Sequence, residues 1–169
     1  MPNTKQTALF TLHSELKAKF TSFAGYTMPL YYPLGMIKEH QHTRAQAGLF
    51  DISHMGQLQL TGPDCAAELE KLVPSNLQNL QPGRQCYTVM TNESGGIIDD
   101  LIIANLGSHF LLIVNASQKE TDLQHLQKHL SKQCKIQLLT EQSLLALQGP
   151  YAITVLEQYV PALSSMPYM

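Results

Sequence analysis

The sequence predicts an α+β fold in which helices pack on a mostly antiparallel sheet. Two observations lead to this prediction. Segments with helical periodicity are interspersed with short alternating segments, and short glycine-containing connections join consecutive strand segments, as they do in antiparallel hairpins. The 169 residues, 44% of them hydrophobic and 14% charged, suffice for one packed domain or for one domain with part of a neighbour.

Four segments are predicted to be helical. In the first, helical spacing relates Leu34, Ile37, Gln41, Arg44 and Ala45, and Gly48 follows as a stop signal. In the second, Pro63 suits the first turn, where its missing N–H costs nothing. In the third, Leu123, Leu126 and Leu130 line one face. The four segments are residues 34–47, 63–72, 117–130 and 149–159.

Six segments are predicted to be strands. In the first, Leu58 and Leu60 alternate with two glutamines, which is typical of a half-buried strand. The segment from His109 to Val114 is almost continuously apolar, so we expect it to be buried on both faces. The six segments are residues 56–61, 84–90, 97–104, 109–114, 135–139 and 144–147.

Composition and charge argue against several classes of protein. Eleven Lys and Arg against 13 Asp and Glu give a net charge of −2 without a basic patch, so we expect no nucleic-acid partner. The cysteines Cys65, Cys86 and Cys134 are odd in number and widely spaced, which indicates a reducing compartment. The amino terminus resembles no signal peptide and the apolar runs are short, so we expect no membrane association and a cytoplasmic location.

Three other patterns in the sequence do not indicate a functional site. His125 and His129 are four residues apart on a predicted helix, but a stable zinc site needs at least three protein ligands, so we expect no metal. Ser53 and His54 are adjacent and lack a third group that would complete a nucleophile–base pair. The pair Gly95-Gly96 is not followed by the Gly-Lys-Ser/Thr of a phosphate loop.

The segment 97–104 carries two adjacent aspartates inside an apolar strand. Side chains of a strand alternate between faces, so Asp99 and Asp100 point to opposite sides. Unless a bulge or the strand end exposes both, one carboxylate must lie in apolar surroundings, where hydrogen bonding or a raised pKa offsets the cost. Such groups are candidates for functional sites. The alternative is that both carboxylates begin the strand at its solvent end and bind turn amides.

Several motifs occur in order along nearly the whole chain, and together they resemble one family. They are FAGYTMPLYY from Phe23, RAQAGLFDISHMG from Arg44, PGRQCYTVM from Pro82, GGIIDDLII from Gly95, VNAS from Val114 and ALQGP from Ala146. This set resembles the amino-terminal part of the glycine cleavage system T proteins, the aminomethyltransferases. Six ordered motifs are far more specific than any single one.

The resemblance implies a reaction and a set of site residues. The family moves the methylene of an aminomethyl-dihydrolipoyl group, carried by the lipoylated H protein, to tetrahydrofolate; ammonia leaves and 5,10-methylenetetrahydrofolate forms. Asp100 matches the catalytic aspartate of the family. We therefore expect Asp99 to have a structural role. Positions that contact folate in the family match Met55, Tyr87, Asp100, Ile102 and Asn115. Taken alone, Tyr87 and Met55 would be core residues and Asn115 a helix entry.

Departures from the family pattern limit the prediction. Ala104 stands where many members have a tyrosine that shapes the folate pocket, and Tyr26 replaces a more usual tryptophan. Later folate-binding residues of the family would lie beyond Met169. We therefore expect a truncated chain with an incomplete site, with weak or no activity, whose exposed apolar surface could drive self-association.

The resemblance also implies a domain organisation and leaves other functions open. Residues 1–50 would belong to the first domain of the family, residues 51–140 would form the folate-contacting domain, and residues 141–169 would return to the first domain. The alternatives are a folate-binding regulator of the same superfamily that is not a transferase, the folate domain of a sarcosine- or dimethylglycine-oxidising enzyme, and a structural piece without activity.

Overall fold

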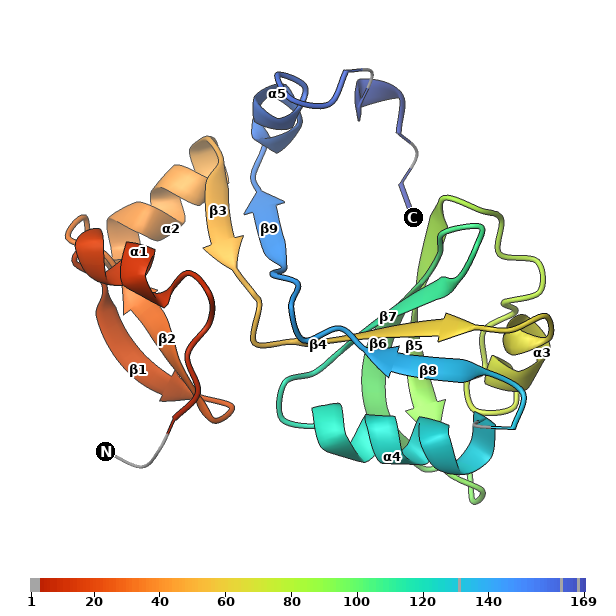
Figure 1. Ribbon diagram of the computed structural model, residues 1–169. Coiled ribbons are helices and arrows are strands. Elements are labelled where there is room, and N and C mark those ends of the chain that lie inside the picture. Colours follow the sequence, from red (N-terminus) through yellow and green to blue (C-terminus); the bar gives the residue numbers. More distant parts are fainter. Residues whose placement is uncertain (1–3, 131, 162, 167) are drawn as a thin grey trace. The chain divides into compact units, whose positions relative to one another are not determined.

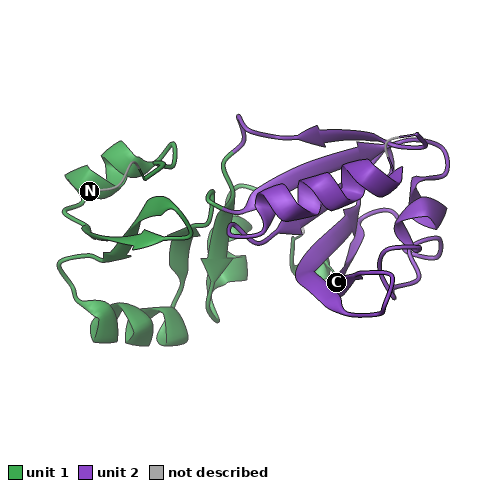
Figure 2. Ribbon diagram, turned by 90° about the horizontal axis from the view of Figure 1, so that it is seen from below, with its two compact units in different colours: residues 1–54, 143–168 green, residues 55–142, 169 purple. Residues whose placement is uncertain are grey.

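The computed structural model describes residues 4–130, 132–161, 163–166 and 168–169 and confirms the predicted α+β fold, with antiparallel sheets and helices packed on them. The chain forms two compact units, shown in different colours in Figure 2. Unit 1 comprises residues 1–54 and 143–168, and unit 2 comprises residues 55–142 and 169.

Unit 2 is built on one five-stranded sheet, in which every neighbouring pair of strands is antiparallel. The strand order is β5-β6-β7-β4-β8, and helix α4 (Lys119–Leu130) lies along the sheet (Figure 1). The strands are β4 (Gly56–Thr61), β5 (Arg84–Thr91), β6 (Ile97–Asn105), β7 (Phe110–Val114) and β8 (Lys135–Leu138).

The core of unit 2 lies on the face of this sheet that α4 covers. Leu58 of β4 pairs with Leu112 of β7, which pairs in turn with Ile103 of β6, and all three side chains are fully buried. Leu126 and Leu130 of α4 belong to the same cluster. Burying one such side chain contributes about 1.5–3 kcal/mol, so this layer fixes the register of the sheet.

The opposite face of the sheet, which we call the open face, is less covered. Leu111 and Ile113 of β7 point to it and are only half-buried, so the prediction that this strand is buried on both faces was wrong. The physical reason is that the buried cluster of unit 2 lies on one side of the sheet only. Gln57 of β4 also points to the open face; it is buried, and its Nε2 atom donates to the carbonyl oxygen of Gln142 at 3.0 Å.

Unit 1 contains two small antiparallel sheets. One pairs β1 (Lys19–Phe23) with β2 (Tyr26–Tyr31), and the other pairs β3 (Gly48–Asp51) with β9 (Leu145–Gln148). The turn between β1 and β2 has positive φ at both Ala24 (47°) and Gly25 (80°), as a tight hairpin requires. The helices are α1 (Phe10–Glu15), α2 (Met36–Ala45), α5 (Ala152–Leu156) and the short 3₁₀ helix η1 (Leu163–Ser165).

The helices differ from the prediction in length and in burial. Helix α2 lies inside the predicted segment, but its apolar stripe is exposed, with 75% of Ile37 accessible. Helix α3 (Cys65–Leu69) is shorter than predicted: residues 70–72 form turns, in which the Leu72 N–H donates to the carbonyl oxygen of Leu69, three residues back, at 2.9 Å. Of the helices in the described part of the chain, none is long and apolar enough to cross a membrane.

Candidate functional site

Strand β6 places its two aspartates in different environments. Asp99 shares the core face with Leu101 and Ile103 and is only 9% exposed, whereas Asp100 points to the open face and is exposed. This confirms that one carboxylate of the pair lies in apolar surroundings, and it rules out the alternative in which both carboxylates face solvent. The register of β5 and β6 shifts between Met90 and Thr91, so an irregularity in the ladder adjoins Asp99.

Tyr87 on β5 forms the first contact of the exposed carboxylate. Tyr87 pairs with Ile102, so its side chain shares the open face with Asp100. The Tyr87 hydroxyl donates to Oδ2 of Asp100 at 3.0 Å. This hydrogen bond, together with burial and the charges of Asp100 and Asp99, raises the pKa of Tyr87, which therefore remains a donor at neutral pH. With 61% of its surface exposed, Tyr87 is not a core residue.

Asn115 forms the second contact and joins the two aspartates. It follows Val114, whose partner Leu101 follows Asp100, so the ladder brings Asn115 opposite the acidic pair. Its Nδ2 atom lies 3.0 Å from Oδ1 of Asp99, 3.2 Å from Oδ1 of Asp100 and 3.1 Å from the Asp100 carbonyl oxygen. The backbone N–H of Asn115 donates to Oδ2 of Asp99 at 3.4 Å. Because all three neighbours of Nδ2 are acceptors, the orientation of this amide is fixed.

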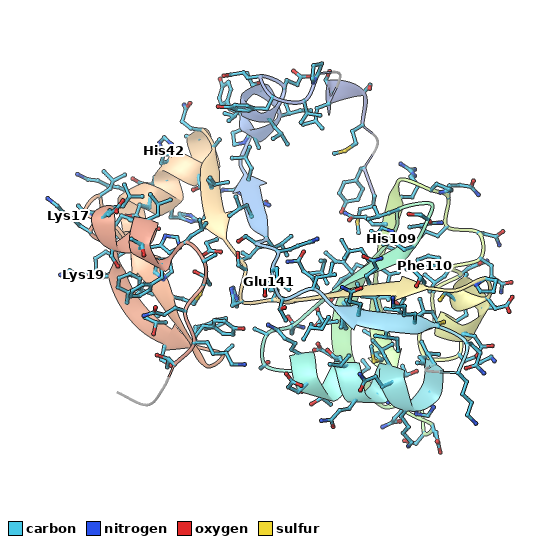
Figure 3. All side chains as sticks on the ribbon, viewed as in Figure 1. Lys17, Lys19, His42, His109, Phe110 and Glu141 are labelled. Atoms are coloured by element: carbon cyan, nitrogen blue, oxygen red, sulfur yellow. The ribbon has the colours of Figure 1, made fainter. Side chains whose placement is uncertain are left out.

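The other two predicted residues lie close to this cluster in the ladder. Ile102 lies on the open face between its partners Tyr87 and Ile113. Met55 precedes Gly56, which pairs with Val114, so Met55 and Asn115 lie at the same end of strands β4 and β7. His109 and Phe110 mark the other end of β7 (Figure 3). Within unit 2 the fold therefore gathers all five residues, and hydrogen bonds join Tyr87, Asp100 and Asn115.

Asp122 of α4 is a member of this cluster that the sequence prediction missed. Its side chain is fully buried, and no donor among the described residues reaches either carboxylate oxygen. Burial, and then hydrogen bonding to and repulsion by Asp99 with a further contribution from Asp100, raises its pKa to about 7. The sequence did indicate its burial, because Asp122 lies four residues before Leu126 and eight before Leu130, so all three share one face of the helix. A carboxylate within that apolar stripe must be buried.

Unit 1 contains a hydrogen-bonded chain of three polar side chains, Tyr32, His13 and Asp51. Tyr32 Oη lies 2.8 Å from Nδ1 of His13, and Nε2 of His13 lies 2.9 Å from Oδ2 of Asp51, beside an apolar cavity of about 400 Å³. Burial opposes ionisation of Asp51, but hydrogen bonds from Ser53 and His13 outweigh it and lower the pKa of that carboxyl. Both ring nitrogens of His13 are engaged within the chain, so this network joins α1 to Tyr32 and Asp51 within unit 1.

Two pairs noted in the sequence, Ser53–His54 and His125–His129, make backbone and packing contacts. Ser53 Oγ donates to the carbonyl oxygen of Leu144 at 3.3 Å and accepts from its N–H at 3.0 Å, so it is engaged by backbone groups. The ring of His54 packs edge-on against Phe23, with 5.5 Å between the ring centroids. His125 and His129 lie 4.6 Å apart by ring centroids, and the described residues contain no group of three side chains that could hold a metal ion.

Comparison with known proteins identifies the family of this chain. The family model described as the GCVT N-terminal domain matches residues 9–169. The chain belongs to the GCVT N-terminal domain family. A relative named mitochondrial aminomethyltransferase, from Dictyostelium discoideum, is 42% identical over 92% of this chain and 41% of its own length. An aminomethyltransferase from Synechocystis sp. is 44% identical over 92% of this chain and 43% of its own length.

A solved structure of the same family supports the fold. The crystal structure of glycine cleavage system aminomethyltransferase T from Bartonella henselae superposes with a TM-score of 0.87 and 42% sequence identity. The match covers 97% of this chain and 44% of that protein. The chain thus spans less than half the length of the relatives that it matches. At one position where it departs from the family pattern, Ala104 lies on the open face of β6, between Gln85 and Leu111.

Proposed function

We propose that this chain supplies the folate-binding part of an aminomethyltransferase of glycine cleavage. The reaction transfers the methylene of the aminomethyl-dihydrolipoyl group on the lipoylated H protein to tetrahydrofolate, with release of ammonia and formation of 5,10-methylenetetrahydrofolate. Tetrahydrofolate acts as a co-substrate, and the reaction needs no metal. Family membership supports the proposal, and the single observation that carries it is the exposed Asp100 carboxylate held by Tyr87 and Asn115.

Asp100 is the proposed catalytic residue, acting through its charge and position. Tyr87 and Asn115 each donate to a different oxygen of Asp100, so the carboxylate has a fixed orientation on the open face. A fixed negative charge can orient an N–H group of the folate and stabilise the positive charge that develops on the transferred carbon. Electrostatic stabilisation and orientation explain this geometry better than full proton abstraction, because two donors already occupy the carboxylate.

The neighbours of Asp100 have the chemistry that a folate needs. The exposed ring of Tyr87 offers an apolar surface for a pterin or benzoyl ring. Asn115 commits both amide hydrogens to Asp99 and Asp100, which leaves its carbonyl oxygen to accept a hydrogen bond from the pterin. Ile102 and Met55 add half-buried apolar surface beside these groups.

The relatives favour the transferase over the non-transferase regulator of the same superfamily. Both curated relatives described above are named aminomethyltransferases, and the solved structure is an aminomethyltransferase of glycine cleavage. The cytoplasmic location stays a prediction, because one relative is named mitochondrial.

Isothermal titration calorimetry with tetrahydrofolate tests the proposal on the chain itself. Asp100→Asn removes the charge and keeps the shape, and a hydrogen bond to a charged group contributes about 1.5–3 kcal/mol, so affinity should fall about 10- to 100-fold. Glu120→Gln is the control, because Glu120 is exposed on α4 and removing its charge should leave affinity unchanged. No binding by the wild-type chain would refute the proposal that this chain by itself binds folate, and equal affinity of Asp100→Asn would remove Asp100 from the site.

A further inference from the structure

Asp99 and Asp122 bring two carboxyl groups together in the core of unit 2. Asp122 is fully buried, and Asp99 is 9% exposed. Asp99 is the carboxyl group that acts most strongly on Asp122, and neither carboxylate oxygen of Asp122 has a hydrogen-bond partner among the described residues. Two ionised carboxylates cannot form a hydrogen bond, because both are acceptors. Two negative charges close together in an apolar environment also repel each other strongly. One proton between the two groups removes both problems.

The hydrogen bonds around the pair show which group holds the proton. Asp99 accepts from the backbone N–H of Asn115 and from its side-chain Nδ2, and both donors favour the ionised form of Asp99. Asp122 receives no donor from the described residues, so its ionised form has no compensation for burial. Its place in the first turn of α4 favours a negative charge, but a helix terminus offsets only a small part of full burial. The charges that act on Asp122 come from Asp99 and Asp100 on β6.

We propose that Asp122 is a protonated acid that donates to Asp99, and that this pair anchors Asn115 and thereby positions Asp100. The contacts run in sequence from Asp122 to Asp99, from Asp99 to Asn115, and from Asn115 to Asp100. Asp122 is thus a positioning residue, because it acts through Asn115 and lies on the core face. The shared proton is a property of the folded chain alone, whereas its effect on ligand affinity rests on the proposed folate function.

Loss of the proton would disturb the whole sequence of contacts. An ionised Asp122 repels Asp99, and Asp99 is the carboxylate that holds Asn115 by two hydrogen bonds. The Asn115 amide would then redistribute its two hydrogens between Asp99 and Asp100, so the orientation of Asp100 would depend on pH. The backbone pairing of β6 and β7 would stay in place, because the buried side chains of Leu101 and Val114 fix it, so only the polar side chains would rearrange.

NMR titration of the aspartate carboxyl carbons tests the shared proton without any ligand. In the wild-type chain one carboxyl should titrate near pH 7, and the side-chain amide of Asn115 should shift with the same midpoint. Asp122→Asn should abolish both transitions, because an amide donates to Asp99 at every pH. Asp64→Asn, an exposed control before α3, should keep both. A wild-type spectrum in which every aspartate carboxyl titrates near its ordinary pKa of 3.8 would overturn the proposal.

Calorimetry with tetrahydrofolate then tests the positioning role. Wild-type affinity should fall several-fold as the pH rises from 6 to 8, because Asp122 loses its proton in this range. The affinity of Asp122→Asn should change little with pH, because asparagine has no proton to lose. A wild-type affinity that is independent of pH, alongside a carboxyl that titrates near pH 7, would leave the shared proton intact and overturn the positioning role. Absence of folate binding would refute the proposed function and leave the NMR result standing.

Discussion

Replacing Asp122 by asparagine should remove a loss of stability that the wild-type chain shows as the pH rises. The folded-state pKa of Asp122 is about 7, raised by burial and by Asp99, whereas the ordinary value is 3.8. The folded chain therefore binds more protons than the unfolded chain between these two values. The stabilising contribution of the protonated acid is complete below about pH 4 and is lost as the pH rises through about 7. Asparagine does not titrate, so the variant lacks this loss.

The size of the effect follows from the two pKa values. Each unit of difference corresponds to about 1.36 kcal/mol, and the two values differ by about three units, which gives an upper limit of about 4 kcal/mol. Asp122 is fully buried, so screening by solvent removes little of this energy. Relative to the wild type, Asp122→Asn should gain on the order of 2–4 kcal/mol of unfolding free energy between pH 4.5 and 8.

Urea unfolding followed by circular dichroism measures this difference. The lowered pKa values of Asp51 and Glu157 give stability curves of the opposite slope, but both proteins contain these groups, so their contributions cancel in the comparison. Asp64→Asn serves as the matched control and should track the wild type at every pH. Parallel curves for wild type and Asp122→Asn across this range would refute the argument for a buried protonated acid.

Two further predictions test the structure of unit 1. Gly149→Ala should destabilise the chain by about 2 kcal/mol or more, because φ at Gly149 is +116° and an added Cβ would clash with the carbonyl oxygen of Gln46. Gly25→Ala is the control: Gly25 also has positive φ but lies in open space, so this substitution should cost only about 1 kcal/mol. Equal losses of unfolding free energy in urea would exclude the clash. Tyr32→Phe should cost about 1 kcal/mol in the same assay, since it removes the hydroxyl that is hydrogen-bonded to Nδ1 of His13, and an unchanged midpoint would show that this hydrogen bond contributes nothing.

Alternation along a strand predicted more of the site than any other sequence pattern. It placed Asp99 and Asp100 on opposite faces of β6, because successive side chains of an extended segment alternate between faces. It could not show that Asn115 joins them, since that contact depends on the register of β6 against β7, which residues far apart in the sequence determine. The family motifs supplied Asn115 instead.

Elements whose signals are local and weak were missed. The hairpin β1–β2 turns at Ala24 and Gly25, and alanine is rare at the first position of a turn that needs positive φ at both residues. Asp122 was missed for a different reason. A carboxylate in the first turn of a helix is usually explained by the helix dipole, and its place in the apolar stripe with Leu126 and Leu130 is the stronger signal.

The same geometry explains why a buried acid pair and an exposed functional carboxylate occur together. Consecutive residues of a strand face opposite sides, so a carboxylate on the open face necessarily has a neighbour on the core face. When that neighbour is also an aspartate, its burial must be offset, and Asp122 and Asn115 together provide the proton and the donors. Asn115 then holds Asp100 from a strand end that the core has already fixed. The costly buried pair thereby gives the exposed carboxylate a rigid support that a side chain held only by solvent would lack.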